Sequence, residues 1–328
     1  MQGISIVIPA YKAEHTIERA VESVLSQKRV HTEIIVIEDG VFDNTQKVLK
    51  KYLGQITIIS FTKNFGAQFA RNKGLASSSY KYVMFLDADD YLEGNFLYGL
   101  SEVAIKDGAD VVFGNCIKRW NSGREKYFFS SKKFKNETST DVIIRWLTAK
   151  AGPAPCSILW KKNSLKKLGG WNEKYYKNQD GELVLRAMFN NLKLAHSLQG
   201  AGIYMQYKGE RISHRLDKKA FDSQQMLFDY IKVSAKATQE EEKILDALNY
   251  YCVGIINSAQ ITRDFEVIGK WEKMWNRKFP KLNLIKYHGY KIYVIHFLYY
   301  LFGISNVRKI IDFYKKLNSL VYGTSDLA

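Results

Sequence analysis

Three carboxylates fall within four residues at Asp87-Ala88-Asp89-Asp90, directly after the apolar run Tyr82–Leu86. Like charges at this spacing repel one another, and the repulsion is costly unless a cation neutralises it. Carboxylate oxygens suit Mg²⁺ or Mn²⁺, whose sites usually keep coordination positions open for substrate phosphates. The sequence therefore indicates a divalent-cation site. The alternative is a solvated turn in which Asp89 or Asp90 caps the next helix.

A further carboxylate, Asp39, ends a second apolar run and precedes Gly40. A carboxylate at a strand end, followed by a flexible turn, is able to accept hydrogen bonds from a nucleotide base or a ribose. The alternative is an Asp that only stabilises the turn or caps a helix.

The segment Lys63–Asn72 contains a glycine, Gly66, that is expected to open a helix. Free backbone N–H groups at a helix start could face an anion. Arg71 follows about one and a half turns later and could reach a base or a diphosphate. One glycine is a weak phosphate-loop pattern, and an ordinary surface ion pair is the alternative for Arg71.

Asp180 lies in the run Asn178-Gln179-Asp180-Gly181-Glu182, where a helix is expected to start. A carboxylate at such a position normally caps the helix, a contribution of about 1 kcal/mol. The polar aromatic loop before it leaves the side chain open to a substrate, so a general base is the second interpretation.

Helices and strands must bring these residues together, and hydrophobic periodicity predicts where those elements lie. Apolar strands are predicted over residues 4–8, 33–37, 56–59, 82–86 and 109–113, with helices over 17–25, 43–49, 67–76 and 95–106 between them. Alternating strands and helices predict a mostly parallel sheet with helices on both faces. Ligands of such sheets bind beyond the carboxyl ends of the strands, where Pro9–Glu14, Glu38–Asp43 and Asp87–Asp90 fall.

The later chain divides into two further regions. Residues 116–215 are mixed: a basic hairpin or loop over Lys118–Lys135, helices over 141–150 and 180–190, and strands over 157–160 and 201–207. From Asp217 onward the pattern predicts helices only, with one apolar stripe from Ile244 to Ile256. We therefore predict domains at 1–115, 116–216 and 217–328.

Several short motifs occur together in an order that resembles family 2 glycosyltransferases with the GT-A fold. They are Pro9-Ala10-Tyr11, Glu38-Asp39-Gly40, Asn64-x-Gly66 with Ala70-Arg71-Asn72, Phe85–Asp90, and Gly169-Gly170-Trp171 followed by Gln179-Asp180. Each motif alone is weak, but five in register are specific, and they cover about residues 1–215. The resemblance implies a Rossmann-like, mostly parallel α/β domain followed by an all-helical C-terminal region.

The resemblance also implies roles for individual residues. Those that would bind the nucleotide sugar are Pro9, Tyr11, Glu14, Asp39, Asn64, Gly66, Arg71, Asp87, Ala88, Lys208 and Arg215. Asp89 and Asp90 would hold Mn²⁺ or Mg²⁺, and His214 would complete the metal shell unless it is a plain surface histidine. Asp180 would be the catalytic base. Two departures from the family pattern are Glu38 and Gln179, where the family usually has Asp and Glu.

The activity implied by the resemblance is metal-dependent, inverting sugar transfer. The donor would be a UDP-hexose or UDP-N-acetylhexosamine and the acceptor a hydroxyl of a glycan or lipid-linked glycan, in bacterial cell-surface polysaccharide synthesis. One alternative is a non-catalytic binding protein with the same fold. Another is a basic nucleic-acid-binding protein, although no recognition motif supports it. A nicotinamide-dependent oxidoreductase is disfavoured because no GxGxxG follows the first strand.

Composition limits the remaining possibilities. The chain has 328 residues and a net charge of +16, which favours an anionic partner such as nucleotide phosphates, nucleic acid or a membrane surface. With 46% hydrophobic residues it is able to bury a full core, which excludes wholesale disorder. Cys116, Cys156 and Cys252 are widely spaced, so buried, reduced thiols are expected rather than a metal cluster or redox pair.

The two chain ends bear on location. The N-terminus reads as a strand rather than a signal peptide, and no apolar run reaches the length of a bilayer crossing. We expect a cytoplasmic protein, with peripheral association at the inner face of the plasma membrane. The basic, aromatic residues 286–316 favour an interfacial helix. Helices packed on the catalytic domain, or an oligomer interface, are the alternatives.

Overall fold

The computed structural model describes residues 3–40, 43–149, 152–207, 216–262 and 264–274. These residues form two compact units. Of the described residues, the first unit contains those within 3–143, 152–207 and 222–227, and the second those within 144–149, 216–221 and 228–274. The sequence-based boundaries at 115 and 216 stay predictions, and the structure adds that part of the helix near residue 145 belongs to the second unit.

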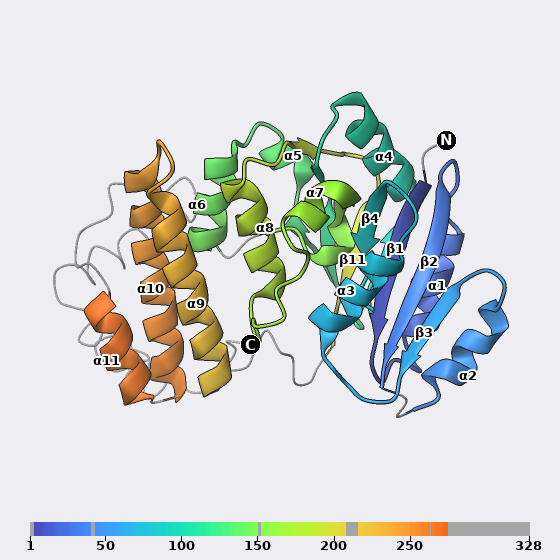
Figure 1. The fold of residues 1–328 in the computed structure, drawn as a ribbon, viewed down its shortest axis with the longest axis horizontal. Helices are drawn as coiled ribbons and strands as arrows, with labels where there is room; N and C mark the ends of the chain where they lie inside the picture. The colour runs from blue at the N-terminus through green and yellow to red at the C-terminus, as the bar shows by residue number, and fades with distance from the viewer. Residues whose placement is uncertain (1–2, 41–42, 150–151, 208–215, 263, 275–328) are drawn as a thin grey trace, which may run out of the picture. The chain divides into compact units, whose positions relative to one another are not determined.

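The first unit is built on a central sheet that contains seven of the described strands, in the order β10-β6-β9-β4-β1-β2-β3. Their bounds are β1 Gly3–Ala10, β2 His31–Asp39, β3 Thr57–Phe61, β4 Tyr82–Phe85, β6 Val111–Phe113, β9 Ile158–Lys161 and β10 Leu194–His196. Every pairing is parallel except those of β9 with β4 and with β6. Figure 1 shows β1, β2 and β3 side by side.

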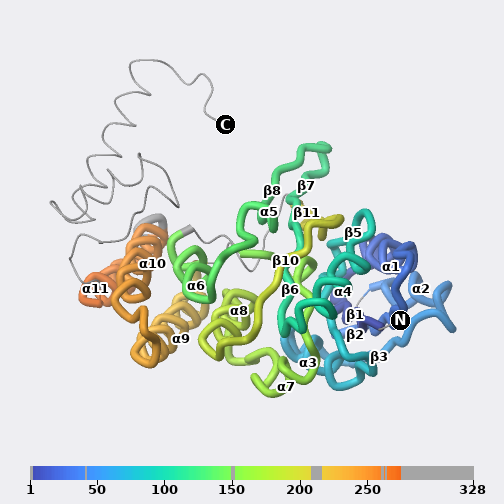
Figure 2. The backbone as a smooth tube through the Cα atoms, turned by 90° about the horizontal axis from the view of Figure 1, so that it is seen from above, coloured from blue at the N-terminus to red at the C-terminus, as the bar shows by residue number. Residues whose placement is uncertain are grey.

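Helices follow the strands and cover both faces of this sheet. Their bounds are α1 Ile17–Leu25, α2 Thr45–Leu49, α3 Ala67–Ser77, α4 Phe96–Lys106, α7 Lys162–Lys167 and α8 Gln179–Phe189, with 3₁₀ turns η1 Lys50–Tyr52 and η2 Pro155–Ser157. The chain adds β2 and β3 on one side of β1 and then returns to add β4 on the other side. Because the crossovers are right-handed, α1 and α3 lie on opposite faces of the sheet, as Figure 2 shows. The predicted α/β class with a mostly parallel sheet is confirmed.

Burial explains why these segments take these positions. β1 and β4 are buried on both faces, as the unbroken apolar runs predict. One stripe of α1 is buried: Ile17, Ala20, Val21 and Val24. Helix α3 approaches β1 so closely that a Cβ on Gly74 would lie 2.2 Å from Val7 Cγ1, so only glycine fits there.

A second sheet of the first unit has four described strands in the order β5-β11-β7-β8. They are β5 Tyr91–Glu93, β11 Ala201–Gln206, β7 Cys116–Trp120 and β8 Glu125–Phe129. β7 and β8 form the hairpin expected for the basic segment, and the short helix α5 (Ser131–Phe134) follows. Helix α6 (Ser139–Ala149) comes next. The three-residue strands β5 and β10 were not predicted.

The second unit is helical in its described residues. α9 (Lys218–Ala235), α10 (Glu241–Thr262) and α11 (Phe265–Met274) supply most of it. The predicted apolar stripe lies in α10, where Ile244, Leu248, Cys252 and Ile256 are buried. Trp271 packs edge-on against Phe228 and Tyr251, with ring centroids 5.6 and 6.3 Å apart. Helices after Asp217 are thus confirmed through residue 274, and the basic aromatic residues 286–316 lie outside the described residues.

Two further expectations meet the structure here. Within the described residues, no helix is long and apolar enough to cross a bilayer. Cys116, Cys156 and Cys252 are all buried free thiols, as predicted. The fold nevertheless brings Cys116 and Cys156 within hydrogen-bond contact, which their sequence spacing did not indicate.

Candidate active site at the carboxyl ends of β1, β2 and β4

The acidic run forms a tight turn directly after β4. The Asp90 N–H donates to the carbonyl of Asp87 at 2.9 Å. Asp87 and Asp89 are half-buried, whereas Asp90 is fully buried and its Oδ1 accepts the Met205 N–H of β11 at 2.9 Å. Burial raises the pKa of Asp90 well above the usual value of a carboxyl group, and the negative charges of Asp89 and Asp87 add to this rise. Asp90 therefore faces the second sheet and fixes the turn to it.

The turn is tied to the rest of the site through Arg71 of α3, whose exposed fraction is 6%. Its Nη2 donates to Asp87 Oδ1 at 2.5 Å, and its Nη1 donates to Gln179 Oε1 at 3.2 Å. The alternative of an ordinary surface ion pair for Arg71 is therefore wrong: the guanidinium is buried, its partner Asp87 is half-buried, and its contacts join α3, the acidic turn and the start of α8. This network brings together Arg71, Asp87 and the start of α8.

An aromatic ring supports the same guanidinium. Arg71 lies over the ring of Trp171, with 4.4 Å between Cζ and the ring centroid, and Trp171 packs edge-on against Phe85 at 5.1 Å. Asn72 fixes the tryptophan backbone, donating to the Trp171 carbonyl and accepting its N–H, each at 2.9 Å. Asn72 also donates to Glu173 at 2.8 Å. The Gly-Gly-Trp motif thus serves as a platform for Arg71.

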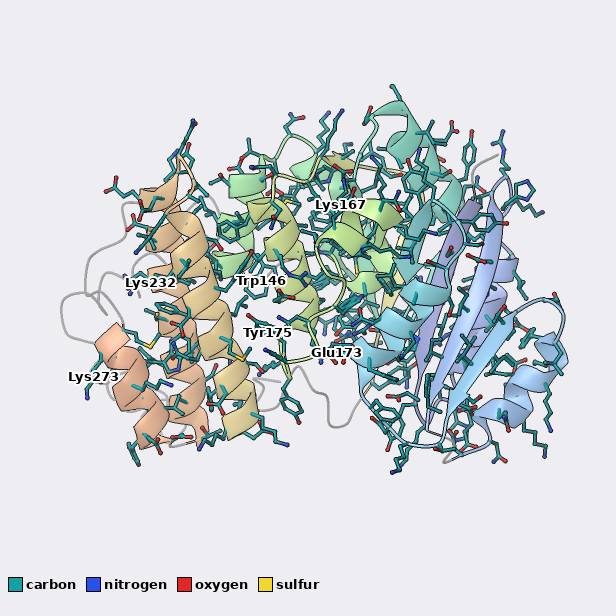
Figure 3. All side chains as sticks on the ribbon, viewed as in Figure 1. Trp146, Lys167, Glu173, Tyr175, Lys232 and Lys273 are labelled. Atoms are coloured by element: carbon teal, nitrogen blue, oxygen red, sulfur yellow. The ribbon has the colours of Figure 1, made fainter. Side chains whose placement is uncertain are left out.

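The start of α8 presents Asp180. Asn178 before it adopts a left-handed conformation (φ 60°), and Gln179 lies between Asn178 and Asp180. Figure 3 labels Glu173 and Tyr175 in the loop that leads into this helix. Asp180 is exposed, and protein atoms around its carboxyl group partly desolvate it.

This desolvation raises the pKa of Asp180, and the nearby negative charge of Asp87 acts in the same direction. The Gly181 N–H and the positive charge of Arg71 oppose the rise. A carboxylate with a raised pKa is the kind of group that accepts a proton in general-base catalysis.

Asp39 ends β2 and is buried, with 3% of the residue exposed. Its two oxygens accept the backbone N–H groups of Phe65 at 2.8 Å and Gly66 at 2.7 Å. Gly66 adopts φ +101°, which favours glycine. These two N–H groups lie just before α3 and bind the protein's own Asp39, and the predicted role of the helix start in binding a ligand anion stays a prediction. Asn64, immediately before them, is exposed.

The residues after β1 form a second corner of the site. Tyr11 is 46% exposed, and the Lys12 ammonium lies 5.5 Å from the centroid of its ring. Glu14 accepts the backbone N–H of Asn44 at 3.0 Å and its side-chain amide at 2.8 Å, while the Glu14 N–H donates to Asp43 at 3.1 Å. This reciprocal pairing joins the β1 and β2 loops. Pro9 is the next-to-last residue of β1.

Sequence reasoning did not identify Arg19 as part of this region. Its Nη2 donates to the Asp89 carbonyl at 2.8 Å and to the Tyr207 hydroxyl at 2.6 Å, and its Cζ lies 4.6 Å from the Tyr91 ring centroid. Arg19 therefore holds the acidic turn from the α1 side. Arg19 is the third residue of α1, and its position in the sequence gave no sign of this role.

The sequence assigned no role to Glu38 or Glu182, and in the structure both make contacts that support the fold. Glu38 is 1% exposed and accepts the Ser60 hydroxyl at 2.6 Å across the β2–β3 pairing. Glu182 pairs with Arg186 at 2.6 Å, and Arg186 also donates to the Gly170 carbonyl at 2.8 Å. This pair fixes the turn before Trp171. Glu38, which replaces the usual aspartate of the family pattern, is therefore a buried side chain.

The remaining predicted residues divide by whether the structure describes them. Ala88 is buried within the acidic turn. Lys208, His214 and Arg215 lie outside the described residues. Among the described residues, no group of three or more His, Cys, Asp or Glu side chains is placed to hold a metal ion.

Known proteins resemble this chain in sequence. YibD of Escherichia coli K12, an uncharacterized glycosyltransferase, is 26% identical over 76% of this chain and 74% of its own length. WfgD of Escherichia coli, named a UDP-Glc:alpha-D-GlcNAc-diphosphoundecaprenol beta-1,3-glucosyltransferase, is 35% identical over 34% of this chain. TarP of Staphylococcus aureus, named a poly(ribitol-phosphate) beta-N-acetylglucosaminyltransferase, is 35% identical over 35% of it. The matches span only 45% of WfgD and 36% of TarP.

A solved structure shares the fold. The crystal structure of S. aureus TarS 1–349 in complex with UDP-GlcNAc aligns with a TM-score of 0.67 at 17% identity, covering 96% of this chain and 92% of TarS 1–349. It confirms the GT-A fold. The sequence pattern of glycosyl transferase family 2 matches residues 5–168, which contain the acidic turn, Asp39 and Arg71. The chain belongs to glycosyl transferase family 2.

Proposed function

We propose that this protein is an inverting glycosyltransferase. It transfers a hexose or N-acetylhexosamine from a UDP-sugar to a hydroxyl of a glycan or lipid-linked acceptor during bacterial cell-surface polysaccharide synthesis. The observation that carries the proposal is the position of Arg71, which joins Asp87 of the acidic turn to the helix that presents Asp180. Donor-binding and acceptor-activating groups thereby belong to one network.

Helix α3 connects the proposed donor contacts. Its start is held by Asp39, and Arg71 farther along the same helix pairs with Asp87. In the proposal, Asp39 accepts hydrogen bonds from the uridine, using lone pairs that its two backbone contacts leave free. Pro9, Tyr11, Glu14 and Asn64 lie on the loops around it. Lys208 and Arg215 complete the donor contacts in the proposal.

The acidic turn fits a divalent cation by the chemistry of its donors. Asp87 and Asp89 offer carboxylate oxygens, and cations in phosphate chemistry often take only one or two carboxylates, with substrate phosphates and water completing the shell. We assign Mn²⁺ or Mg²⁺ to Asp89, with Asp87 beside it and His214 as a further ligand. The hydrogen bond of Asp90 to β11 favours a positioning role for that residue. When bound, the cation would neutralise charge on the leaving diphosphate.

Asp180 serves as the base in this mechanism. The acceptor oxygen attacks the anomeric carbon from the face opposite the diphosphate, its proton passes to the Asp180 carboxylate, and the bond from the anomeric carbon to the phosphate oxygen breaks. One displacement inverts the anomeric configuration. The raised pKa of Asp180 makes it a better proton acceptor than an ordinary aspartate.

The donor and acceptor classes are supported by similar proteins. The names of WfgD and TarP specify transfer to a diphosphoundecaprenol-linked sugar and to poly(ribitol-phosphate). The TarS structure holds UDP-GlcNAc. A lipid-linked acceptor would place the reaction at the cytoplasmic face of the membrane, with the protein attached peripherally.

A donor panel tests the proposal. UDP-glucose, UDP-galactose, UDP-GlcNAc and UDP-GalNAc are incubated with the full chain and Mn²⁺, and released UDP is measured beside thermal shift. At least one donor should stabilise the protein and release UDP, while Asp180→Asn should keep the thermal shift and lose acceptor-dependent UDP release. The absence of both signals with every donor would contradict the proposal. A salt-sensitive shift of DNA in the same protein would favour nucleic-acid binding instead.

A further inference from the structure

The β7–β8 hairpin carries an unusual concentration of positive charge. The segment from Lys118 to Lys135 contains seven Lys or Arg residues and a single acid, Glu125. Figure 2 shows the hairpin projecting from the first unit beside β11. The proposed transfer mechanism uses none of these residues. Their positions in the strands determine which side of the sheet carries the charge.

Strand register places most of the charge on one side of the second sheet. Lys118 lies directly opposite Lys126 in the antiparallel β7–β8 pairing, and Tyr204 of β11 lies beside Lys118 in the parallel pairing. Alternate residues share a face, so Trp120, Arg124 and Phe128 belong to the same side. We call these six residues the basic face: Lys118, Trp120, Arg124, Lys126, Phe128 and Tyr204.

The basic face combines its cations with aromatic rings. Lys118 Nζ lies 4.0 Å from the Phe128 ring centroid and 5.6 Å from that of Tyr204, and the Arg124 guanidinium lies 5.2 Å from that of Trp120. The face is not a closed hydrophobic core, since Trp120, Phe128 and Tyr204 are half-buried and Arg124 and Lys126 are exposed. Such rings can stack on sugars while the neighbouring cations meet anions.

The opposite side of the same sheet is neutralised within the protein. Arg119 donates to Glu93 at 3.0 Å and also pairs with Glu125, which lies across from it in the hairpin. The apolar residues Ala201, Ile203 and Met205 cluster on that side. In contrast, the described strand positions of the basic face carry no Asp or Glu.

Retaining two lysines opposite each other has a cost in stability. Like charges directly across an antiparallel pair are destabilising, and an opposite charge at either position would relieve the repulsion. A bound anion would do the same. A surface that binds anions would therefore retain the pairing of Lys118 with Lys126. A hairpin with only a structural role would be more stable without it.

Strand β11 links the basic face to the acidic turn of the proposed active site. Tyr204 belongs to the face, and the adjacent Met205 donates its N–H to Asp90 in the acidic turn. A polymer that lies along β7 and β8 would thus extend from a strand that contacts the reaction centre. We propose that the basic face binds an acceptor glycan chain that carries phosphate groups, with phosphates on Lys118, Lys126 and Arg124 and sugars on the rings. This inference rests on the proposed glycosyltransferase function and specifies its acceptor class.

The test compares two charge-reversal variants of the full chain. Arg124→Glu/Lys126→Glu alters the basic face, and Lys47→Glu/Lys50→Glu makes the same change in net charge at exposed positions on α2 and η1. The probes are fluorescently labelled poly(glycerol phosphate), neutral dextran of similar length, and phosphatidylglycerol vesicles. Binding is measured by anisotropy for the polymers and by flotation for the vesicles. Circular dichroism and thermal melting confirm that both variants are folded, and Lys126→Gln provides a milder change.

The expected result is that poly(glycerol phosphate) binds the native chain in a salt-sensitive way and binds the basic-face variant about tenfold more weakly than the control variant. Lys126→Gln should fall between them, and dextran should bind none of them. Equal affinities for poly(glycerol phosphate) in the two reversed variants would overturn the proposal. A specific loss of vesicle flotation alone would assign the face to a membrane instead. UDP-sugar hydrolysis, measured in parallel, reports separately on the proposed function and should be unchanged in the basic-face variant.

Discussion

Arg71 donates to Asp87 across 2.5 Å, and this ion pair connects the helix that starts at the Asp39 carboxylate with the acidic turn after β4. The same guanidinium reaches Gln179, whose side chain carries no charge. A glutamate at that position would compete with Asp87 for the positive charge. With Gln179 in its place, the charge of Arg71 is directed toward the acidic turn and toward Asp180.

Replacing Arg71 by methionine should impair both stability and activity. Methionine leaves Asp87 beside Asp89 and Asp90 without its cation, and loss of one partner of a buried pair costs about 3 kcal/mol. We expect a decrease of about that size in the free energy of unfolding in urea. Loss of two charged hydrogen bonds that orient Asp87 and α8 should lower kcat/KM by about 10²-fold.

The matched control for Arg71 is Arg29→Met. Arg29 is exposed and lies over the Tyr98 ring at 4.8 Å, so it shares the ring contact but has no place in the site. Arg71→Lys should recover part of the stability because it restores the charge. Equal transfer rates for Arg71→Met and Arg29→Met would show that the Arg71–Asp87 pair does not organise the site.

A second prediction separates backbone strain from donor binding at Gly66. Gly66 and Gly54 have φ values of +101° and +86°, so alanine at either position should cost about 1–3 kcal/mol in folding stability. Of these two glycines, Gly66 donates its N–H to Asp39 and Gly54 has no contact with that carboxylate. Gly66→Ala should therefore raise the KM for the UDP-sugar about tenfold, whereas Gly54→Ala should leave it unchanged. Parallel increases in both variants would mean that donor binding follows general stability instead.

Local patterns predicted the elements that position the site. Continuous apolar runs identified β1, β2 and β4, because burial on both faces of a sheet favours unbroken apolar residues. Apolar periodicity also predicted α1 and four of its buried residues, but Leu25, which the same stripe includes, is 38% exposed. The strands β5 and β10 have three residues each, too few for a period to show. Their existence depends on pairing with strands that are distant in the sequence.

The candidate site residues could be named from the sequence, but their contacts could not. Asp87, Asp39 and Asp180 were identifiable because carboxylates at strand and helix ends are conspicuous. That Asp39 would bind the Gly66 N–H, or that Arg19 would hold the Asp89 carbonyl, depends on strand order and loop geometry. The contact between Cys116 and Cys156 has the same origin, since the two residues are 40 positions apart and lie in β7 and η2.

A third prediction distinguishes positioning from metal binding at Asp90. Asp90→Asn keeps an oxygen that is able to accept the Met205 N–H, whereas Asp90→Leu leaves that buried N–H without an acceptor, at a cost of about 1–3 kcal/mol. A positioning role predicts that Asp90→Leu is destabilised in urea and that Asp90→Asn keeps the native affinity for Mn²⁺ in the presence of UDP. Asp89→Asn, at the assigned metal ligand, should weaken Mn²⁺ binding about tenfold. If Asp90→Asn weakens it as much, Asp90 is a ligand.

A fourth prediction concerns the pH dependence that Asp180 should impose. The base must be deprotonated, and desolvation raises its pKa above the ordinary 3.8 of an aspartate. The acid limb of the kcat profile should therefore fall at a higher pH than an unperturbed aspartate would give. Because Arg71 lowers the pKa of Asp180, Arg71→Met should move this limb to still higher pH. The folded state also binds this proton more tightly than the unfolded state, so the contribution of Asp180 to stability decreases as pH rises from 3.8 through the folded pKa.

Asp180→Asn should remove the acid limb and lower kcat by about 10²–10⁴-fold, the usual contribution of a general base. Asp107→Asn, at an exposed position that ends α4, is the control and should keep both the rate and the profile. UDP-sugar affinity should be unchanged in both variants, since Asp180 acts on the acceptor. Transfer in Asp180→Asn at the native rate, or with the same acid limb as the native enzyme, would require another residue to accept the proton.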